Sequence, residues 1–173
     1  MEKYENTDLL KDLNVSEKYL NYRKTVLQYT NEDMGLRLDN DEQVYIAVFD
    51  MPMKSGIVGF QTQTLALVFG LNTHLYHGSG SAVPGLEKRE SVMKAMQSLL
   101  ISSHQVLPYM QHVKETEFYN SDNVRVYLKT GKGIFFKELS DKENKIDSFL
   151  LGMMNYVMKA ISDSGGIEGN IVS

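Results

Sequence analysis

The feature that most limits how this chain can fold is a pair of strand-like segments joined by a short turn. The segments "VRVYLKT" (124–130) and "GIFFKEL" (133–139) are rich in β-branched and aromatic residues, and glycines mark the turn between them. This pattern predicts a β-hairpin. In the first arm, apolar side chains alternate with Arg125, Tyr127 and Lys129. Because successive side chains of a strand point to opposite faces, we expect one covered face and one face open to water.

Three further strand-like runs lie earlier in the chain, at 44–50, 56–70 and 73–77. The first run, "VYIAVFD", is dominated by β-branched and aromatic residues, which favour strands. Pro52 should stop it, because proline cannot donate a hydrogen bond to a neighbouring strand. Only short turns separate the three runs, so they predict an antiparallel meander.

Apolar residues follow a helical period in three other places. Residues 16–30 carry apolar side chains three, four and seven positions apart, and Ser16 is a suitable N-cap. Residues 86–106 predict a middle helix with one apolar face. Ser140 and Glu143 have the spacing of a capping box, so we expect the last helix to begin there.

These elements predict one α+β domain over residues 1–162, followed by a flexible tail at 163–173. The expected element order is α-βββ-α-ββ-α. The expected architecture has two layers, a five-stranded antiparallel sheet with helices on one face and the other face partly open. A chain of 173 residues can bury about 70% of its unfolded surface, so it needs neither metal nor disulfide to fold.

The order of elements over residues 16–162 resembles the fold of type III secretion chaperones and of other bacterial proteins that share that fold. The likeness lies in element order alone, and no motif of the family is matched, so no residue takes a role from it. It implies a small, acidic, usually dimeric protein that binds another protein. A profilin-like or roadblock-like fold is the alternative. It has a similar set of helices and strands, but the middle helix separates a group of two strands from a group of three.

Composition and charge argue against several classes of function. The chain has no cysteine, which excludes disulfides, thiolate metal sites and a cysteine nucleophile. Its 18 Lys and Arg residues against 22 Asp and Glu give a net charge of −4, whereas nucleic-acid binding needs concentrated cations. No apolar run approaches the roughly 20 residues that span a bilayer. We therefore expect a cytoplasmic protein without a cofactor that binds neither nucleic acid nor membrane.

The segment "HGSGSAVPG" most resembles an active-site loop. A hydrolase would use Ser79 or Ser81 of this Gly78–Gly85 loop as its nucleophile. His77 or His74 would then be the base, but closeness in sequence does not place a base within reach of a hydroxyl group. The loop also lacks the GxSxG elbow and the glycine pattern of a phosphate-binding loop. We interpret it as a strand-to-helix connection and keep a hydrolase as an alternative.

The predicted open face of the sheet is the best candidate for a binding surface. If Leu75 points into the core, His74 and Tyr76 point outward and join the polar side chains of the 124–130 strand. Leucines near the N-terminal end, in "DLLKDL", make a second candidate contact. The candidate residues are His74, Tyr76, Arg125, Tyr127, Lys129, Leu9, Leu10 and Leu13.

We therefore predict a non-enzymatic bacterial protein-binding domain of the chaperone, adaptor or immunity type, whose partner is another protein or a second copy of itself. Aromatic and arginine side chains are common anchors of such interfaces. A small-molecule sensor is the other alternative, with its pocket between the sheet and the middle helix. A cavity of roughly a few hundred Å³ lined by convergent polar groups would favour the sensor.

Overall fold

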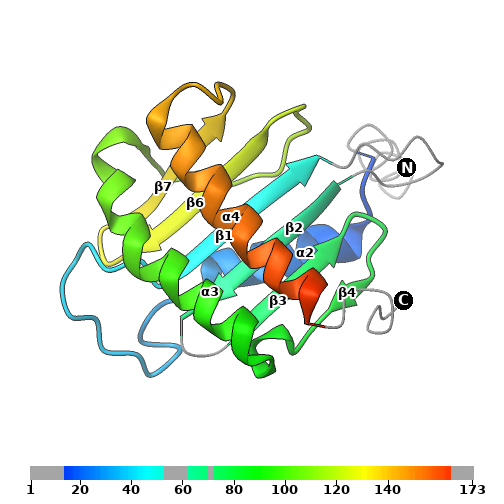
Figure 1. Cartoon of the computed structure of the whole chain (residues 1–173), viewed down its shortest axis with the longest axis horizontal. Coiled ribbons are helices and arrows are strands. Elements are labelled where there is room, and N and C mark those ends of the chain that lie inside the picture. The colour runs from blue at the N-terminus through cyan, green and yellow to red at the C-terminus, as the bar shows by residue number, and fades with distance from the viewer. Residues whose placement is uncertain (1–13, 53–61, 70–71, 165–173) are drawn as a thin grey trace, which may run out of the picture.

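The computed structural model describes residues 14–52, 62–69 and 72–164. Over these ranges the chain is an α+β structure with three α-helices and one antiparallel sheet (Figure 1). The helices are α2 (Glu17–Gln28), α3 (Glu90–Ser102) and α4 (Lys145–Asp163). The strands are β1 (Ile46–Pro52), β2 (Thr62–Val68), β3 (Asn72–His77), β4 (Ala82–Val83), β5 (Gln111–Val113), β6 (Val124–Thr130) and β7 (Gly133–Leu139).

The sheet has seven strands in the described part of the chain, where we expected five. Their spatial order is β4-β3-β2-β1-β6-β7-β5, and each neighbouring pair is antiparallel. The two additional strands, β4 and β5, are two and three residues long. Segments this short cannot show a period-two pattern, which is why they were missed. The expected succession of the longer elements is confirmed.

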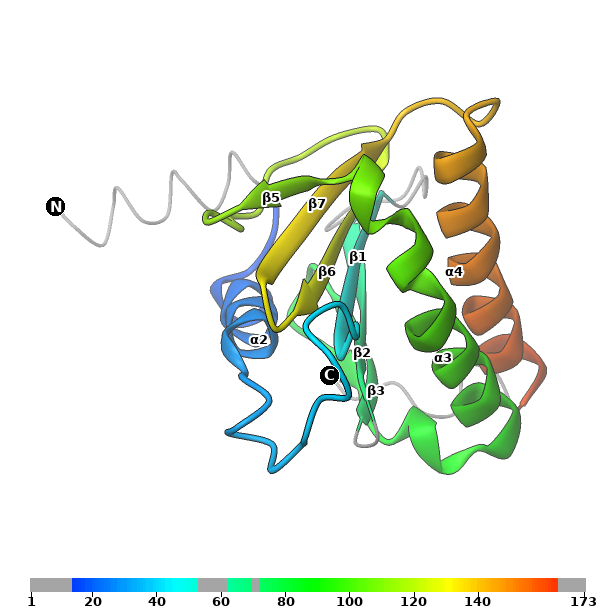
Figure 2. The ribbon, with the colours of Figure 1, turned by 90° about the vertical axis from the view of Figure 1, so that its left-hand side faces the viewer.

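Helices cover both faces of the sheet, so the expected open face is wrong. Figure 2 shows α2 on one side of the strands and α3 with α4 on the other. Strand β1 supplies both sides: Ala47 and Phe49 belong to the core under α3 and α4, whereas Ile46 and Val48 pack in a second core with Tyr19 of α2. A near-continuous apolar run such as "VYIAVFD" is typical of a strand buried on both faces. The apolar run in β1 therefore predicted which faces of the sheet are buried better than the alternation of apolar and polar residues in β6 did.

The first two helices begin close to their predicted positions. Ser16 is the N-cap of α2, as expected, and its hydroxyl group accepts a hydrogen bond from the Tyr19 amide at 3.1 Å. The predicted middle helix is divided into a 3₁₀ turn at Leu86–Lys88, helix α3, and a second 3₁₀ turn at Ser103–Tyr109 that contains a proline. Proline has no amide hydrogen to continue an α-helical ladder, so the last part tightens into the 3₁₀ form.

Helix α4 begins later than the predicted capping box. Its N-cap is Asn144, whose side-chain oxygen accepts hydrogen bonds from the amides of Ile146 at 2.9 Å and Asp147 at 3.1 Å. Asparagine satisfies the free amides of a first helical turn as well as serine does, so a later cap was equally available. The helix continues through Asp163 with Ser164 as its C-cap, and the rest of the predicted tail lies outside the described residues.

Candidate functional site

The five sheet residues predicted as a binding surface lie on the face that α2 covers, and they do not form one open patch. Tyr76, Arg125 and Tyr127 are buried, with exposed fractions of 6%, 1% and 3%. His74 and Lys129 are half-buried. The expectation that these side chains face water is therefore wrong. The three candidate leucines of the N-terminal segment, Leu9, Leu10 and Leu13, lie outside the described residues.

Lys129 has a structural position at the end of α2. Its ammonium group donates hydrogen bonds to the backbone carbonyls of Leu27, at 2.9 Å, and of Tyr29. The last carbonyls of a helix lack partners within the helix, and a cation stabilises the negative end of the helix dipole. Lys129 therefore joins strand β6 to the C-terminal end of α2.

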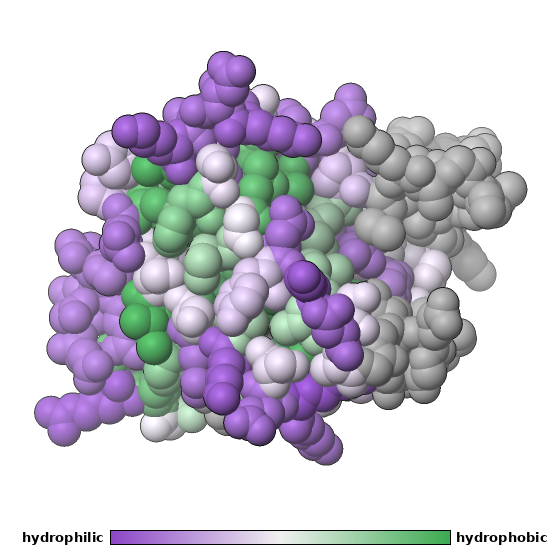
Figure 3. Space-filling view, viewed as in Figure 1, coloured by the Kyte–Doolittle hydropathy of each residue, from purple (hydrophilic) through white to green (hydrophobic). Residues whose placement is uncertain are grey.

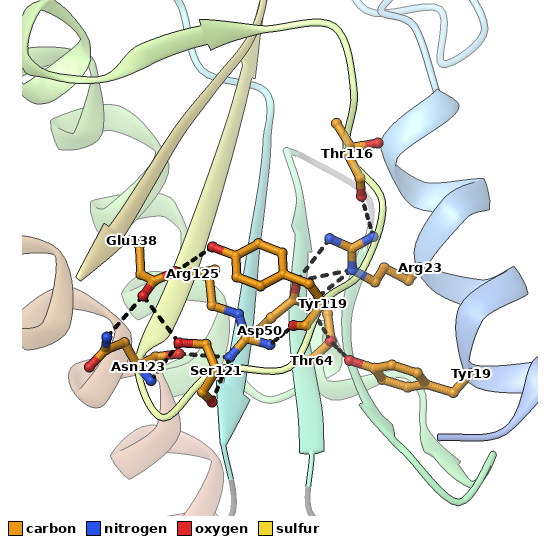
Figure 4. A network of polar contacts seen from close by, with 10 residues as sticks. All are labelled: Tyr19, Arg23, Asp50, Thr64, Thr116, Tyr119, Ser121, Asn123, Arg125 and Glu138. Carbon is orange, nitrogen blue, oxygen red and sulfur yellow. Dashed lines mark hydrogen bonds and ion pairs between the residues drawn. The ribbon is translucent and has the colours of Figure 1, made fainter. Parts of the chain in front are cut away.

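A buried ion pair joins α2 to the centre of the sheet (Figure 4). The Arg23 guanidinium donates to the Asp50 carboxylate from Nε, at 3.0 and 3.1 Å, and from Nη2 at 2.8 Å. Thr64 donates to the same carboxylate at 2.7 Å and also pairs with the Tyr19 hydroxyl group. Burial by itself would lower the pKa of Arg23, but the charge and the hydrogen bonds of Asp50, with smaller contributions from Tyr127 and Tyr19, together outweigh burial and raise this pKa above its ordinary value. Arg23 is thus charged and fully engaged.

Arg125 holds the segment between β5 and β6 against the sheet. Its guanidinium donates to the carbonyl oxygens of Tyr119 at 2.8 Å, Ser121 at 3.2 Å and Asn123 at 2.7 Å (Figure 4). It also lies over the Tyr119 ring, with the guanidinium carbon 5.3 Å from the ring centre. Backbone carbonyls and an aromatic face can satisfy a buried cation without a carboxylate. From the sequence we interpreted this segment as a polar connection, and no pattern in it indicated that its backbone carbonyls bind Arg125.

Glu138 holds the same segment from its other side. Its carboxylate accepts hydrogen bonds from the Tyr119 hydroxyl group, from Ser121 at 3.1 Å and from Asn123 at 2.9 Å. The bond from Tyr119 is the main reason why the pKa of Glu138 lies below its ordinary value. The arrangement resembles an anchor rather than a reaction centre, because the Glu138 carboxylate and both Nη atoms of Arg125 are already hydrogen-bonded within it, and only Nε of Arg125 is buried without a partner.

A hollow remains between α2 and the β2–β4 side of the sheet, and we call it the tyrosine groove. Its volume is about 350 Å³. The ring of Tyr22 from α2 stacks on Tyr76 from β3, with centroids 5.0 Å apart and planes inclined by 19°. Two of the predicted site residues, His74 and Tyr76, therefore lie in one pocket. The lining residues are Tyr22, Thr25, Val26, Tyr29, Ala66, Val68, Asn72, His74, Tyr76, Ala82 and Pro84.

Small side chains on the strands leave the space that the groove occupies. Ala66 of β2 lies under α2, and Ala82 of β4 lies beside Tyr76, its partner across the sheet. Larger side chains at these two positions would fill the space between helix and strands. The sensor alternative expected a pocket against the middle helix, but this pocket lies against the first helix instead.

Burial favours the uncharged forms of His74 and Tyr76 in the groove. The His74 ring nitrogen Nδ1 and the Tyr76 hydroxyl group form a hydrogen bond of 2.9 Å. Burial lowers the pKa of His74 below its ordinary value of 6.5. Burial, with smaller contributions from Tyr29 and Tyr22, raises the pKa of Tyr76 to about 12. The groove thus combines aromatic rings with neutral hydrogen-bonding groups.

The Gly78–Gly85 loop does not assemble the hydrolase arrangement. The hydroxyl groups of Ser79 and Ser81 pair with each other at 3.3 Å. Within the described part of the chain, neither serine hydroxyl group is hydrogen-bonded to a histidine ring, and the Nε2 atom of His77 is buried without a partner. Part of the loop is instead strand β4. A serine nucleophile with its base is therefore not formed by these residues.

The described residues contain neither a cluster of metal ligands nor a membrane-spanning helix. Among residues 14–52, 62–69 and 72–164, no three or more His, Asp or Glu side chains gather as a metal site would require. None of the helices in these ranges has the length and apolar character that a bilayer crossing demands.

Comparison with known proteins assigns this chain to no family. No family model, curated protein or solved structure matches it. The resemblance to secretion chaperones therefore stays a prediction.

Proposed function

We propose that this protein is a non-enzymatic binding domain and that its tyrosine groove holds a small, flat, uncharged molecule. The observation that carries the proposal is the meeting of Tyr22, His74 and Tyr76 in one hollow of about 350 Å³. Small-molecule sites are mostly apolar hollows of roughly 300–1,000 Å³ with a few polar groups that fix orientation. The groove has this composition.

The shape and charge of the ligand follow from the side chains of the groove. Tyr22 and Tyr76 already lie nearly parallel, and a further aromatic ring is stabilised by an offset stack on such a surface. The neutral state of His74 and Tyr76 provides no partner for an ionic ligand, whose burial without one would be costly. The second nitrogen of His74 can donate or accept one hydrogen bond, according to its tautomer.

Indole is a suitable first probe, because it is flat, uncharged and carries one N–H donor. The chain contains no tryptophan, so exciting indole at a wavelength above the absorption band of the tyrosines lets its fluorescence anisotropy be followed without protein emission. We expect the anisotropy to rise with the wild-type protein. It should not rise with Ala82→Leu, in which the larger side chain fills the groove and every hydrogen-bonding group remains.

The matched control is Ala160→Leu, the same change at a half-buried position of α4 on the opposite side of the sheet. It should bind indole as the wild type does, and circular dichroism should show that both variants are folded. Equal binding of indole to Ala82→Leu, or no binding of indole to the wild type, would contradict the proposal.

A protein partner, including a second copy of this chain, is the second candidate function. It is favoured by apolar side chains exposed on the α3–α4 side, Ile101 at 64% and Tyr156 at 54%, and by Tyr109, exposed at 65% in the 3₁₀ turn after α3. Figure 3 shows this side, where apolar areas lie between polar ones. Measuring the molecular mass by sedimentation in the same samples separates the two candidates. A mass that rises with concentration, without indole binding, would favour the protein partner.

A further inference from the structure

A second and larger hollow lies along α2, on the side away from the tyrosine groove. One stripe of the helix, from Leu20 to Gln28, forms one wall, and residues between 114 and 118, which follow β5, form the other. Ile134 of β7 completes the lining, and the volume is about 680 Å³. We call this hollow the α2–114 groove.

The rim of the α2–114 groove carries more positive than negative charge. Lys24 and Lys114 are exposed on its two sides, and Glu117 is the exposed acid among its lining residues. Arg23 lies in the wall, but its charge is taken up by Asp50. The rim therefore has two free cations against one anion, on a chain whose net charge is −4. An acidic occupant is favoured here by local charge complementarity.

The inner surface of this groove is apolar. Leu27 and Phe118 are buried in it, whereas Leu20 and Ile134 are half-buried. Covering the last two with aliphatic side chains would remove more apolar surface from water, which stabilises a contact. The suitable occupant is thus a chain segment with both acidic and leucine side chains.

Residues 1–13 of this chain, "MEKYENTDLLKDL", have that chemistry. The segment contains four acidic side chains, two lysines and the leucines at positions 9, 10 and 13. It directly precedes Asn14, two residues before the N-cap Ser16 of α2. The helix stripe from Leu20 to Gln28 is about 12 Å long, since each helical residue rises 1.5 Å. Thirteen extended residues span up to about 45 Å, so the segment is long enough to reach the whole stripe.

We propose that residues 1–13 bind in the α2–114 groove of the same molecule. The leucines cover Leu20 and Ile134, and the acidic side chains lie near Lys24 and Lys114. Bound in this way, the segment would occupy the larger of the two hollows described beside α2. This inference is independent of the function proposed for the tyrosine groove.

The absence of cysteine from the chain allows a direct test in the whole 173-residue chain. An Asn6→Cys variant carries a nitroxide spin label at its single cysteine. The backbone amide NMR signals of Leu27 and Ile134 are recorded in ¹⁵N-labelled protein with the spin label oxidised and then reduced. We expect the oxidised label to cause a loss of intensity at these two signals. The signals of Leu150 and Ile161, in α4 on the opposite side of the sheet, should keep their intensity.

Two variants of the labelled protein test the chemistry of the contact. Replacing Leu9 and Leu10 by serine should restore the intensity at Leu27 and Ile134, and so should Lys24→Glu combined with Lys114→Glu. The matched control is Lys159→Glu on α4, an exposed lysine on the opposite side of the sheet, which should leave the loss unchanged. Indole binding should be the same in all of these variants, which separates this test from that of the tyrosine groove.

Three outcomes would overturn the proposal. The first is full intensity at Leu27 and Ile134 with the oxidised label. The second is a loss that the leucine and lysine changes do not reverse. The third is a loss that appears when spin-labelled protein without ¹⁵N is mixed with ¹⁵N-labelled protein without a spin label, because the segment would then bind a second copy.

Discussion

On the α3–α4 face of the sheet the packed side chains are almost all apolar, whereas on the α2 face charged, polar and aromatic side chains share the buried space. Helix α4 buries four apolar residues and one acid, and α3 buries apolar residues alone. Helix α2 buries four residues, and one of them is Arg23, paired with Asp50. The same strand β1 supplies Phe49 to the first face and Asp50 to the second.

We therefore expect the two faces to contribute differently. The apolar face contributes mainly to the stability of the fold, and the polar face mainly to the orientation of α2 on the sheet. Apolar burial is not directional, so the α3–α4 face can stabilise the fold without fixing each contact. A buried ion pair adds little net stability, because removing two charges from water offsets their attraction. Its hydrogen bonds are directional, however, and those of Arg23 reach both Asp50 and the backbone of Thr116. We infer that the polar contacts set how α2 lies on the sheet, and with it the shape of both grooves.

The largest effect is expected when the buried ion pair is broken on one side. Asp50→Ala leaves the Arg23 charge buried without its partner and should lower the free energy of unfolding by about 3–5 kcal/mol. Urea denaturation measures this change. Replacing both residues, with Arg23→Met and Asp50→Leu, should recover most of the loss, because no charge is then left unpaired.

The control for this prediction is Glu42→Ala, which removes an exposed ion pair with Lys132 at 3.5 Å. Exposed pairs contribute about 0–1 kcal/mol, so the change should be small. If Asp50→Ala destabilises the protein no more than Glu42→Ala does, the two faces are held in the same way and the comparison fails.

The second prediction concerns the apolar face. Leu99 of α3 is completely buried there, and Leu99→Ala should lower the free energy of unfolding by about 2–5 kcal/mol through lost burial and the cavity left behind. Urea denaturation again gives the value, with Gln97→Ala on the exposed side of α3 as the control. Because α2 contacts other strand residues, indole binding should persist in Leu99→Ala. Loss of both stability and binding would show that the faces are not independent.

The smallest effect is expected from His74 on the α2 face. Burial lowers the pKa of His74 below 6.5, so between these two values the unfolded chain binds more protons than the folded one. Stability should therefore fall as the pH falls from 6.5 through the folded-state pKa. His74→Asn should reduce this slope without abolishing it, because burial lowers the pKa of His77 as well. Thermal unfolding between pH 5 and 7 measures the slope, and an unchanged slope in His74→Asn would contradict the assignment.

Local sequence patterns predicted several helices and strands of this fold. The packing of elements that lie far apart in the sequence could not be predicted from such patterns. The strands β6 and β7 have the expected bounds, and Ser16 caps α2, because alternation and capping depend on neighbouring residues. Which face α2 covers depends on contacts with strands far along the chain. The burial of Arg125 depends on carbonyl groups of the preceding segment, which no periodicity reveals.

The candidate site was predicted in part. His74 and Tyr76 were predicted as site residues, and both line the tyrosine groove, although they were expected on an open face. Tyr22 and Tyr29 were not singled out. Their spacing of seven residues places them on one face of a helix, and that was the available signal. The sequence alone could not show that this helix face lies opposite the small side chains of β2 and β4, Ala66 and Ala82.

The central position of β1 has a consequence for how the chain reaches this structure. Its partner on one side, β2, follows it directly, but its partner on the other side is β6, so that Ile46 pairs with Lys129. Closing such a long loop is entropically costly and slows folding. The β1–β4 meander can form first, and its β1 edge then stays unpaired until β6 arrives. During synthesis or refolding, this edge is the place where two chains would associate wrongly.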